Sequence, residues 1–454
     1  MASQFRLNKL RRYFEKTEVA DVSAHQLVAV RAALRGRVGL LTGGPGTGKT
    51  HTSAVIVRAA RELGLTVGAV APTGKAAVRI TEAMSERGLL IQAETIHTAL
   101  QPMRTGYDGQ GWQFRHCEAD PLPFDLLLCD ETSMVDLELG AKLLGAVQRG
   151  SQVLLVGDPY QLPPVGGGKP FCDLIKAGIP HGHLTEIHRF AGRIAHVCQQ
   201  IREGNKWEPS ERVDLDAPSP ENMRHVECHA SQVIPTMLAL IPKLQQYGFI
   251  DPDQIQIICP CNSSGSLSRE KLNTVLQQHW NPNGARAEKN IFRIGDKIMV
   301  SKNFFYPEGQ FARRQLASNH YVANGEIGHV VMNDSKWTEA EFGNRTIRVP
   351  RDFDKPPVPA WAITGHKSQG SQWPCVITVA DGSGAADRVC SRAWWYTVIS
   401  RAGKLSITIG QRAAIDRHCA NVDLDQRKTF LTERIQDWKH KLSSKSSRYV
   451  PSLS

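Results

Sequence analysis

The chain has 454 residues, of which 41% are hydrophobic and 22% are charged, and its formal net charge is +11 at pH 7. These proportions fit a soluble globular protein of two or three domains, and the basic excess favours a polyanionic partner, either nucleic acid or an anionic membrane surface. No run approaches 18 apolar residues, which excludes a membrane-spanning helix, and no apolar segment follows the N-terminal charges as in a secretory signal.

The ten cysteines are scattered and include no Cys-x-x-Cys pair, which argues against a structural zinc site. Several lie in apolar runs, as expected for buried thiols in a reducing compartment. We therefore expect a cytoplasmic protein.

Apolar runs alternate with helical stretches from residue 24 onward. Short Val- and Leu-rich runs of this kind are typical of strands that are buried on both faces of a parallel sheet. The first series lies at 38–42, 66–71, 124–130 and 152–158, and a second lies at 255–260, 375–380 and 404–410. The alternation predicts an α/β protein with two such domains.

Three segments depart from this pattern. Residues 102–123 contain Asp108-Gly109, a strong turn signal, and predict a hairpin inserted in the first domain. Residues 291–355 show short strand patterns without helical periodicity and predict a small β-barrel inserted in the second domain. The polar, Ser-rich segment 441–454 is predicted to be a disordered tail.

A phosphate-binding loop is predicted at Gly43–Thr50, where the sequence GGPGTGKT follows a strand and precedes a helix. Glycines let the loop amides converge on phosphate oxygens, and the helix N-terminus adds positive dipole density. Lys49 would reach the β- and γ-phosphates, and the Thr50 hydroxyl would coordinate Mg²⁺. The pattern therefore predicts ATP and Mg²⁺ as cofactors.

Two acidic residues follow the apolar run LLLC. Asp130 would hold the magnesium ion through water, and Glu131 could polarise the attacking water as a general base. The alternative is an ordinary pair of solvated turn residues.

Hydrolysis also requires positive charge near the γ-phosphate. Arg189 and Arg401 each lie near the end of an apolar stretch and are candidates for this role. From the residues alone, either could equally be a surface ion-pair partner. The sequence HGH at 181–183 has the spacing of a metal-binding pair, but no acidic cluster accompanies it, and we expect a loop with two exposed histidines.

The motifs occur in an order that resembles the superfamily 1 DNA helicases, and most closely the RecD/Dda-like 5′→3′ subclass. They cover residues 26 to about 410 and read GGPGTGKT, APTGKAA, TIHTAL, LLLCDETSMVD, LLVGDPYQLPPV, LTEIHR, WAITGHKSQGSQW and WWYTVISRA. The resemblance implies two RecA-like P-loop NTPase domains with parallel sheets, a β-hairpin pin in the first and an SH3-like β-barrel in the second. Because the chain begins about 40 residues before the phosphate loop, it resembles the compact phage-type forms.

The resemblance extends the predicted nucleotide site. In the family, a glutamine upstream of the phosphate loop reads the adenine, another senses the γ-phosphate, and two arginines close on that phosphate from the second domain. Arg189 and Arg401 match these arginines, and Gln161 matches the sensor and would act with Lys49 and Glu131 in catalysis. The implied nucleotide-binding positions are Gln26, Gly43, Gly44, Pro45, Gly46, Thr47, Gly48, Lys49, Thr50, Gly370 and Gln372. Relatives usually have an acidic residue where this chain has Gln372, and a carboxylate there would accept a hydrogen bond from the ribose hydroxyl of the nucleotide. The preference of this chain for the sugar of the nucleotide is therefore left open.

The resemblance also implies contacts with single-stranded DNA. Polar and cationic side chains on loops at strand ends can bind phosphates and stack against bases. For the histidines among them, a structural role is the alternative that the residues alone would favour. The implied contacts are Pro72, Thr73, Thr95 and His97 in the first domain, and Thr364, His366, Lys367 and Ser368 in the second. Tyr107, Trp112 and Phe114 are the predicted strand-separating residues of the pin, for which an inert surface hairpin is the alternative.

The predicted domains are a first motor domain at 1–190 with a basic segment at 1–23, a second motor domain at 191–290 and 356–440, the barrel at 291–355 and the tail. We expect an ATP-dependent 5′→3′ helicase that binds single-stranded DNA and strand junctions, has no membrane partner and acts as a monomer in a bacterial or phage-infected cell. Replication or recombination proteins are possible partners. The alternatives are a translocase without strong unwinding and a DNA-binding subunit whose ATPase is idle.

Overall fold

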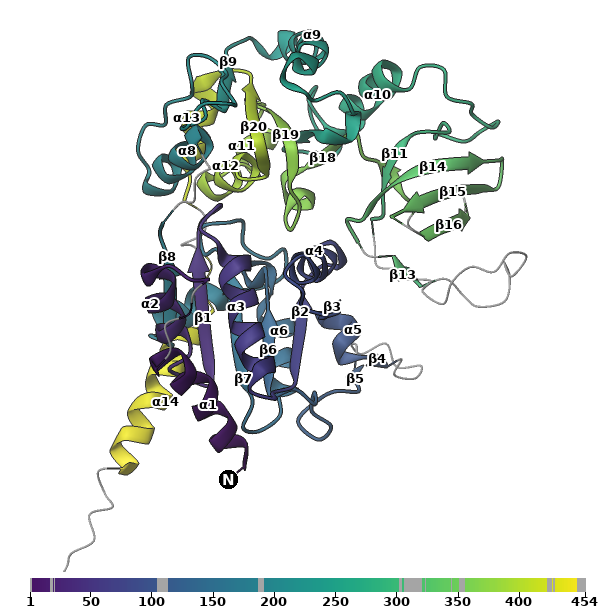
Figure 1. The fold of residues 1–454 in the computed structure, drawn as a ribbon. Helices are drawn as coiled ribbons and strands as arrows, with labels where there is room; N and C mark the ends of the chain where they lie inside the picture. The colour runs from purple at the N-terminus through teal and green to yellow at the C-terminus, as the bar shows by residue number, and fades with distance from the viewer. Residues whose placement is uncertain are drawn as a thin grey trace, which may run out of the picture. The chain divides into compact units, whose positions relative to one another are not determined.

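The computed structural model describes residues 2–16, 19, 21–103, 113–186, 192–301, 304–305, 321–322, 324–343, 345–350, 356–422, 427 and 429–446. The chain divides into two compact units. Unit 1 comprises Met1–Pro72, Ala76–Glu186 and Asp423–Ser454, and unit 2 comprises Thr73–Lys75 and Ile187–Val422. Each unit is built around its own parallel sheet (Figure 1), so the predicted class of two RecA-like α/β domains is confirmed.

Six parallel strands form the sheet of unit 1, in the order β3-β2-β6-β7-β1-β8. The four predicted strands are present within two residues of their expected limits. β3 and β8 were not predicted, because they are short and carry polar residues. The strands are β1 (Val38–Gly43), β2 (Val67–Ala71), β3 (Ala93–Thr95), β6 (Leu126–Cys129), β7 (Gln152–Gly157) and β8 (His181–Leu184).

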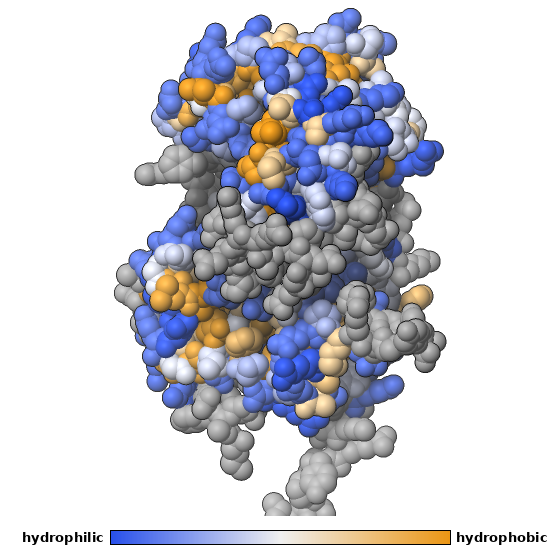
Figure 2. Space-filling view, turned by 90° about the vertical axis from the view of Figure 1, so that its right-hand side faces the viewer, coloured by the Kyte–Doolittle hydropathy of each residue, from blue (hydrophilic) through white to orange (hydrophobic). Residues whose placement is uncertain are grey.

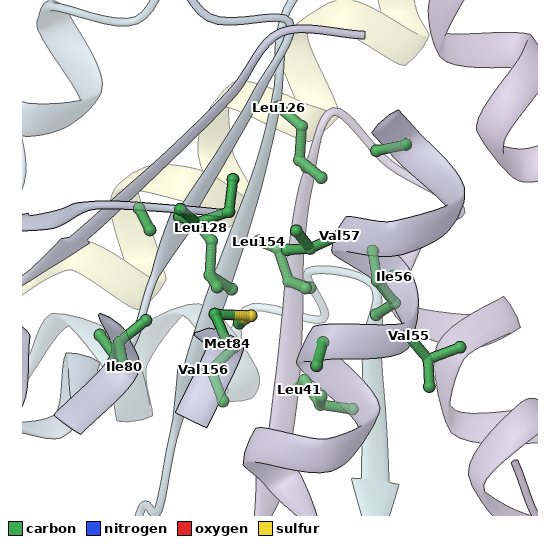
Figure 3. Packing of buried hydrophobic residues seen from close by; sticks show 14 of the residues in the cluster. Leu41, Val55, Ile56, Val57, Ile80, Met84, Leu126, Leu128, Leu154 and Val156 are labelled. Carbon is green, nitrogen blue, oxygen red and sulfur yellow. The ribbon is translucent and has the colours of Figure 1, made fainter. Parts of the chain in front are cut away.

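Helices cover both faces of this sheet. On one face, Ile56 of α3 and Met84 of α4 pack with Leu41, Leu154 and Val156 of the strands, which Figure 3 shows from close by. This core fixes the helix that follows the phosphate loop against the strand that precedes it. The helices of unit 1 are α1 (Ala2–Lys16), α2 (Ala24–Ala33), α3 (Lys49–Glu62), α4 (Gly74–Ser85), α5 (Ile96–Leu100), α6 (Leu137–Gly145), α7 (Pro170–Lys176) and α14 (Leu431–Ser446).

Two strand glycines let α2 approach the sheet closely. A methyl group added at Gly39 of β1 would overlap the backbone carbonyl oxygen of Ala33, and one added at Gly182 of β8 would overlap that of Ala29. The expectation that residues 181–183 form a loop is therefore wrong. They form a strand paired with β1, and its central glycine is required by helix packing.

The substitution Gly182→Ala is expected to lower the free energy of unfolding by about 1–3 kcal/mol, because the added methyl group must push the α2 backbone away from the sheet. Urea denaturation would measure the change. Gly145→Ala is the matched control, since Gly145 is helical and a methyl group there would meet no atom within 4 Å. Equal stability of the Gly182→Ala variant and the unmodified protein would contradict this account of the packing.

The C-terminal helix belongs to unit 1, which corrects two predictions. Residues 429–440 were assigned to the second motor domain, and residues 441–446 to a disordered tail. Instead α14 extends to Ser446 and packs against α7, and Ile435 contacts the core cluster that contains Phe171. Sequence composition missed this because the helix has few apolar residues, and its Thr432 and Lys439 side chains bond to backbone carbonyls in α7 and just after it.

The sheet of unit 2 has five parallel strands in the order β18-β10-β19-β20-β9. The three predicted strands are present, and the short β9 and β18 were not predicted. The strands are β9 (Met223–Val226), β10 (Ile255–Cys259), β18 (Ala362–Thr364), β19 (Trp373–Val379) and β20 (Ala402–Ile409). The helices are α8 (Gly192–Glu203), α9 (Val233–Leu240), α10 (Arg269–Trp280), α11 (Gly384–Asp387), α12 (Arg392–Ile399) and α13 (Arg412–Ala420).

The inserted segment of unit 2 forms a separate antiparallel sheet (Figure 1) in the order β16-β15-β14-β11-β17. It has its own buried cluster, which includes Ile298, Val330 and Phe342. The SH3-like barrel itself stays a prediction. The strands are β11 (Lys297–Met299), β14 (Ile327–Asn333), β15 (Trp337–Phe342), β16 (Arg345–Pro350) and β17 (Val358–Pro359), and β12 (Phe304–Phe305) pairs with β13 (Tyr321–Val322).

The surface seen in Figure 2 is mixed: hydrophobic residues gather in small patches that hydrophilic residues separate. Within the described part of the chain, no helix combines the length and the apolar character needed to cross a membrane.

Candidate nucleotide site and DNA-binding edges

The phosphate loop connects β1 to α3 (Figure 1). Gly46 and Gly48 have φ values of 73° and 82°, which L-residues with side chains rarely adopt, so the glycines are required by the turn. The Lys49 ammonium group donates to the carbonyl oxygens of Gly43 at 2.7 Å and Gly44 at 3.0 Å. The loop therefore holds its lysine folded over its own backbone, next to the N-terminus of α3, in an arrangement suited to an anionic ligand.

The acidic pair follows β6, two strands away from β1 in the sheet. Burial, and after it the charge of the neighbouring Glu131, raise the pKa of Asp130 to about 6, although the Glu131 amide, Lys49 and Arg79 act in the opposite direction. The Glu131 amide donates to the Asp130 carboxylate at 2.7 Å. Glu131 itself has a φ of 52°, which turns the chain sharply after the strand. A buried carboxylate of this kind is stabilised in its charged form by a cation.

The loop after β7, residues 161–169, carries the predicted sensor, and we call it the sensor loop. Asp158 is fully buried at the end of β7, and its carboxylate accepts from the Tyr160 amide at 3.1 Å. Gln161 is also buried, and its side-chain oxygen finds no hydrogen-bond partner within the described residues. An unsatisfied buried acceptor is costly, and this oxygen is therefore available to accept a hydrogen bond.

Gln26, the predicted adenine reader, has a second role. It forms a capping box at the start of α2. Its side-chain oxygen accepts from the Ser23 backbone amide at 3.1 Å, and its backbone amide donates to the Ser23 hydroxyl at 3.2 Å. The side-chain carbonyl oxygen is thus used at the start of the helix, and the adenine-reading role of Gln26 stays a prediction.

The predicted DNA contacts of the first domain follow the carboxyl ends of β2 and β3. Pro72 and Thr73 come directly after β2. The Thr95 hydroxyl caps α5 by accepting from the Thr98 amide at 3.0 Å, so its position is fixed by the fold. Burial lowers the pKa of His97, with an opposing effect of Asp136, and its Nδ1 atom has no hydrogen-bond partner within the described part of the chain.

The base of the predicted pin is formed by β4 (Pro102–Met103) and β5 (Gln113–Phe114), which pair antiparallel. Phe114 packs against the core of unit 1, with its ring centroid 6.0 Å from that of His97. It therefore supports the hairpin base, and the strand-separating role predicted for it stays a prediction. Tyr107 and Trp112 lie outside the described residues, as does Arg189, which was predicted for the nucleotide site.

Three predicted nucleotide residues of unit 2 meet at one end of its sheet. Arg401 lies just before β20, while Gly370 and Gln372 precede β19. The Arg401 guanidinium donates to the Thr397 carbonyl at 3.1 Å and to the Ser371 carbonyl at 3.4 Å, and the Trp373 amide donates to the Arg401 carbonyl at 3.0 Å. These hydrogen bonds join residues of two distant motifs at the amino ends of the neighbouring strands β19 and β20.

The predicted DNA contacts of the second domain form a 3₁₀ turn at Gly365–Ser368, directly after Thr364 of β18. Ser368 is buried, and its hydroxyl donates to the Gly365 carbonyl at 2.6 Å, so it closes the turn. The Lys367 ammonium group donates to the Asn324 side chain of the inserted segment, and burial lowers its pKa. His366 is half-buried.

Sequence reasoning missed two residues of the first unit. Asp158 follows an apolar strand just as Asp130 does, so the same signal was available for it. Arg79 acts on the pKa of Asp130 from α4, 51 positions earlier in the chain, and no sequence pattern indicated that they meet.

The chain matches two protein-family models: an AAA domain over residues 21–215 and a UvrD-like helicase C-terminal domain over residues 359–409. The ATP-dependent RecD2 DNA helicase of Deinococcus radiodurans is 32% identical over 406 residues, which cover 88% of this chain and 50% of the relative. The RecBCD enzyme subunit RecD of Buchnera aphidicola is 30% identical over 459 residues, which cover 84% of this chain and 71% of the relative. A Bacteroides Pif1 helicase, crystallised with ADP-AlF3 and ssDNA, aligns over 94% of this chain and 98% of its own at 19% identity, with a TM-score of 0.49. Because the match covers 50% of the Deinococcus helicase, the chain spans about half the length of that relative.

Proposed function

The chain belongs to the RecD type of superfamily 1 5′→3′ DNA helicases, and we propose that it is an ATP-driven motor that travels 5′→3′ along single-stranded DNA and unwinds duplex. The observation that carries the proposal is that the predicted motifs of the first domain gather at the carboxyl edge of its sheet. The phosphate loop, the acidic pair, the sensor loop and the DNA contacts predicted for the first domain all follow strands of this one sheet at the same edge. Ligands of open α/β sheets bind at this edge.

In this proposal the nucleotide is ATP. Lys49 and the loop amides hold its phosphates, Glu131 orients and deprotonates the attacking water, and the unpaired Gln161 oxygen responds to the γ-phosphate through that water. Arg401 contributes positive charge, and its anchoring to two backbone carbonyls supports a fixed orientation. Arg189 is assigned the same role by the family pattern.

A magnesium ion fits the donor set of this edge. Thr50 offers a hydroxyl oxygen and Asp130 a carboxylate, which are the hard oxygen ligands that Mg²⁺ prefers. The raised pKa of the buried Asp130 supports this assignment, because a cation would stabilise its charged form. Bound there, Mg²⁺ would neutralise charge on the phosphates.

Single-stranded DNA is the proposed track. Pro72, Thr73 and His97 follow strands of the first sheet, and Thr364 and His366 follow β18 of the second. Two separate contact sets let the two units hold the strand alternately as ATP binds and is hydrolysed, which moves the protein along it.

The test is unwinding of duplexes that carry either a 5′ or a 3′ single-stranded tail, made in DNA and in RNA. We expect ATP-dependent strand separation with the 5′-tailed DNA and little with the 3′-tailed one. Unwinding only from 3′ tails would refute the polarity. Stimulation of ATP hydrolysis by single-stranded DNA without any unwinding would favour a translocase.

A further inference from the structure

Arg427 binds the sensor loop. Its guanidinium donates to the carbonyl oxygens of Pro164 at 2.7 Å and Gly166 at 3.1 Å. Hydrogen bonds from a charged donor are stronger than those between neutral groups, and one guanidinium nitrogen that bridges two carbonyls fixes the backbone between them. The bonds therefore hold the loop that begins at Gln161.

The residues after Arg427 hold the helix that follows the same loop. The Thr429 hydroxyl donates to the carboxylate of Asp173, and the Thr432 hydroxyl donates to the Asp173 backbone carbonyl at 3.3 Å. Lys439 donates to the carbonyls of Ala177 at 2.8 Å and Gly178 at 3.1 Å, just beyond the C-terminus of α7. A cation is favourable at that end of a helix. We call Arg427, Thr429 and α14 together the C-terminal strap.

The opposite side of the sensor loop is held by the start of α6. The Leu137 amide donates to the Gly167 carbonyl at 3.0 Å. A methyl group added at Gly168 would lie 3.0 Å from the Thr429 side chain and 3.2 Å from that of Leu137. The loop is thus clamped between the strap and the segment that follows Asp130 and Glu131 in the chain.

We propose that the C-terminal strap is a positioning element for the sensor loop, and that Arg427 is its principal positioning residue. The strap follows unit 2 after only four intervening residues, since Val422 is the last residue of that unit. Because the chain joins unit 2 to the strap, we expect a change in unit 2 on DNA binding to alter the position of Arg427 and, through its two hydrogen bonds, that of the sensor loop. The inference rests on the proposed function and adds a regulatory connection to it.

The first test compares Arg427→Ala with Arg427→Lys and with Arg434→Ala, which removes a charge from the exposed face of α14. ATP hydrolysis is measured with and without saturating single-stranded DNA. We expect Arg427→Ala to lower the DNA-stimulated kcat about 5- to 30-fold, while the unstimulated rate and the melting temperature change little. Arg427→Lys should recover much of the stimulation, because an ammonium group can also donate to two carbonyls, and Arg434→Ala should resemble the unmodified protein.

Equal losses of stimulated and unstimulated turnover together with a lower melting temperature would show a merely structural role and overturn the proposal. So would unchanged stimulation in Arg427→Ala. If the unmodified protein shows no stimulation by DNA, the proposed function fails, and the strap is then judged by hydrogen exchange. The amides of residues 165–168 should exchange faster in Arg427→Ala than in Arg434→Ala, and identical protection would refute the strap on its own.

Discussion

Replacing Glu131 with glutamine is expected to reduce ATP turnover by about a hundred- to ten-thousand-fold, the range found when a general base is lost. The amide keeps the size of the side chain at the turn after β6 but cannot take a proton from water. Nucleotide binding should persist, because the phosphate loop and Lys49 are unchanged. Steady-state hydrolysis and binding of a fluorescent ATP analogue would measure the two properties separately.

Glu138→Gln provides the matched control, because it makes the same chemical change in the first turn of α6, a few residues further along the chain. Its turnover should remain near that of the unmodified protein. Turnover near normal in Glu131→Gln would remove this residue as the base. Loss of nucleotide binding together with turnover would instead indicate that Glu131 supports the structure of the site.

Replacing Asp130 with asparagine is expected to abolish turnover and yet to stabilise the fold without ligands. Burial raises the pKa of Asp130 from 3.8 to about 6, so the charged form is disfavoured in the folded state. Its contribution to stability is fully present below the unfolded pKa and is lost as the pH rises through about 6. At pH 8 the whole penalty applies, and it amounts to roughly 2–3 kcal/mol.

The measurement is urea denaturation with EDTA present, at pH 5 and pH 8. Asp130→Asn should be more stable than the unmodified protein, and the difference should be larger at pH 8. Asparagine can still accept the hydrogen bond from the Glu131 amide, so the turn is preserved. The control is Asp437→Asn, which lies on an exposed part of α14 and should change stability little. A destabilised Asp130→Asn variant at pH 8 would contradict the assigned pKa direction.

Several side chains that the family pattern assigns to ligands also hold local structure. Gln26 caps α2, Thr95 caps α5 and Ser368 closes the turn after β18. Substitutions at these positions would therefore alter stability and ligand binding together. The substitutions Glu131→Gln and Asp130→Asn test the nucleotide site more sharply, because each replaces a carboxylate with an amide of the same size.

The sequence by itself determined the α/β class, the central strands of both sheets and the phosphate loop. Long apolar runs can be accommodated only where both faces of a strand are buried, and the glycines at 46 and 48 permit the left-handed backbone that the loop requires. Asp130 was also predictable, because it ends such a run.

The tertiary structure alone decided the short strands, the membership of the C-terminal helix and the joining of distant motifs. β3 and β8 are stabilised by their neighbours in the sheet, so their own composition carries little signal. The pairing of β19 with β20 brings Arg401 beside Ser371, and Arg427 reaches the sensor loop across more than 250 positions of sequence. Such contacts depend on where the chain returns in space, which local periodicity does not record.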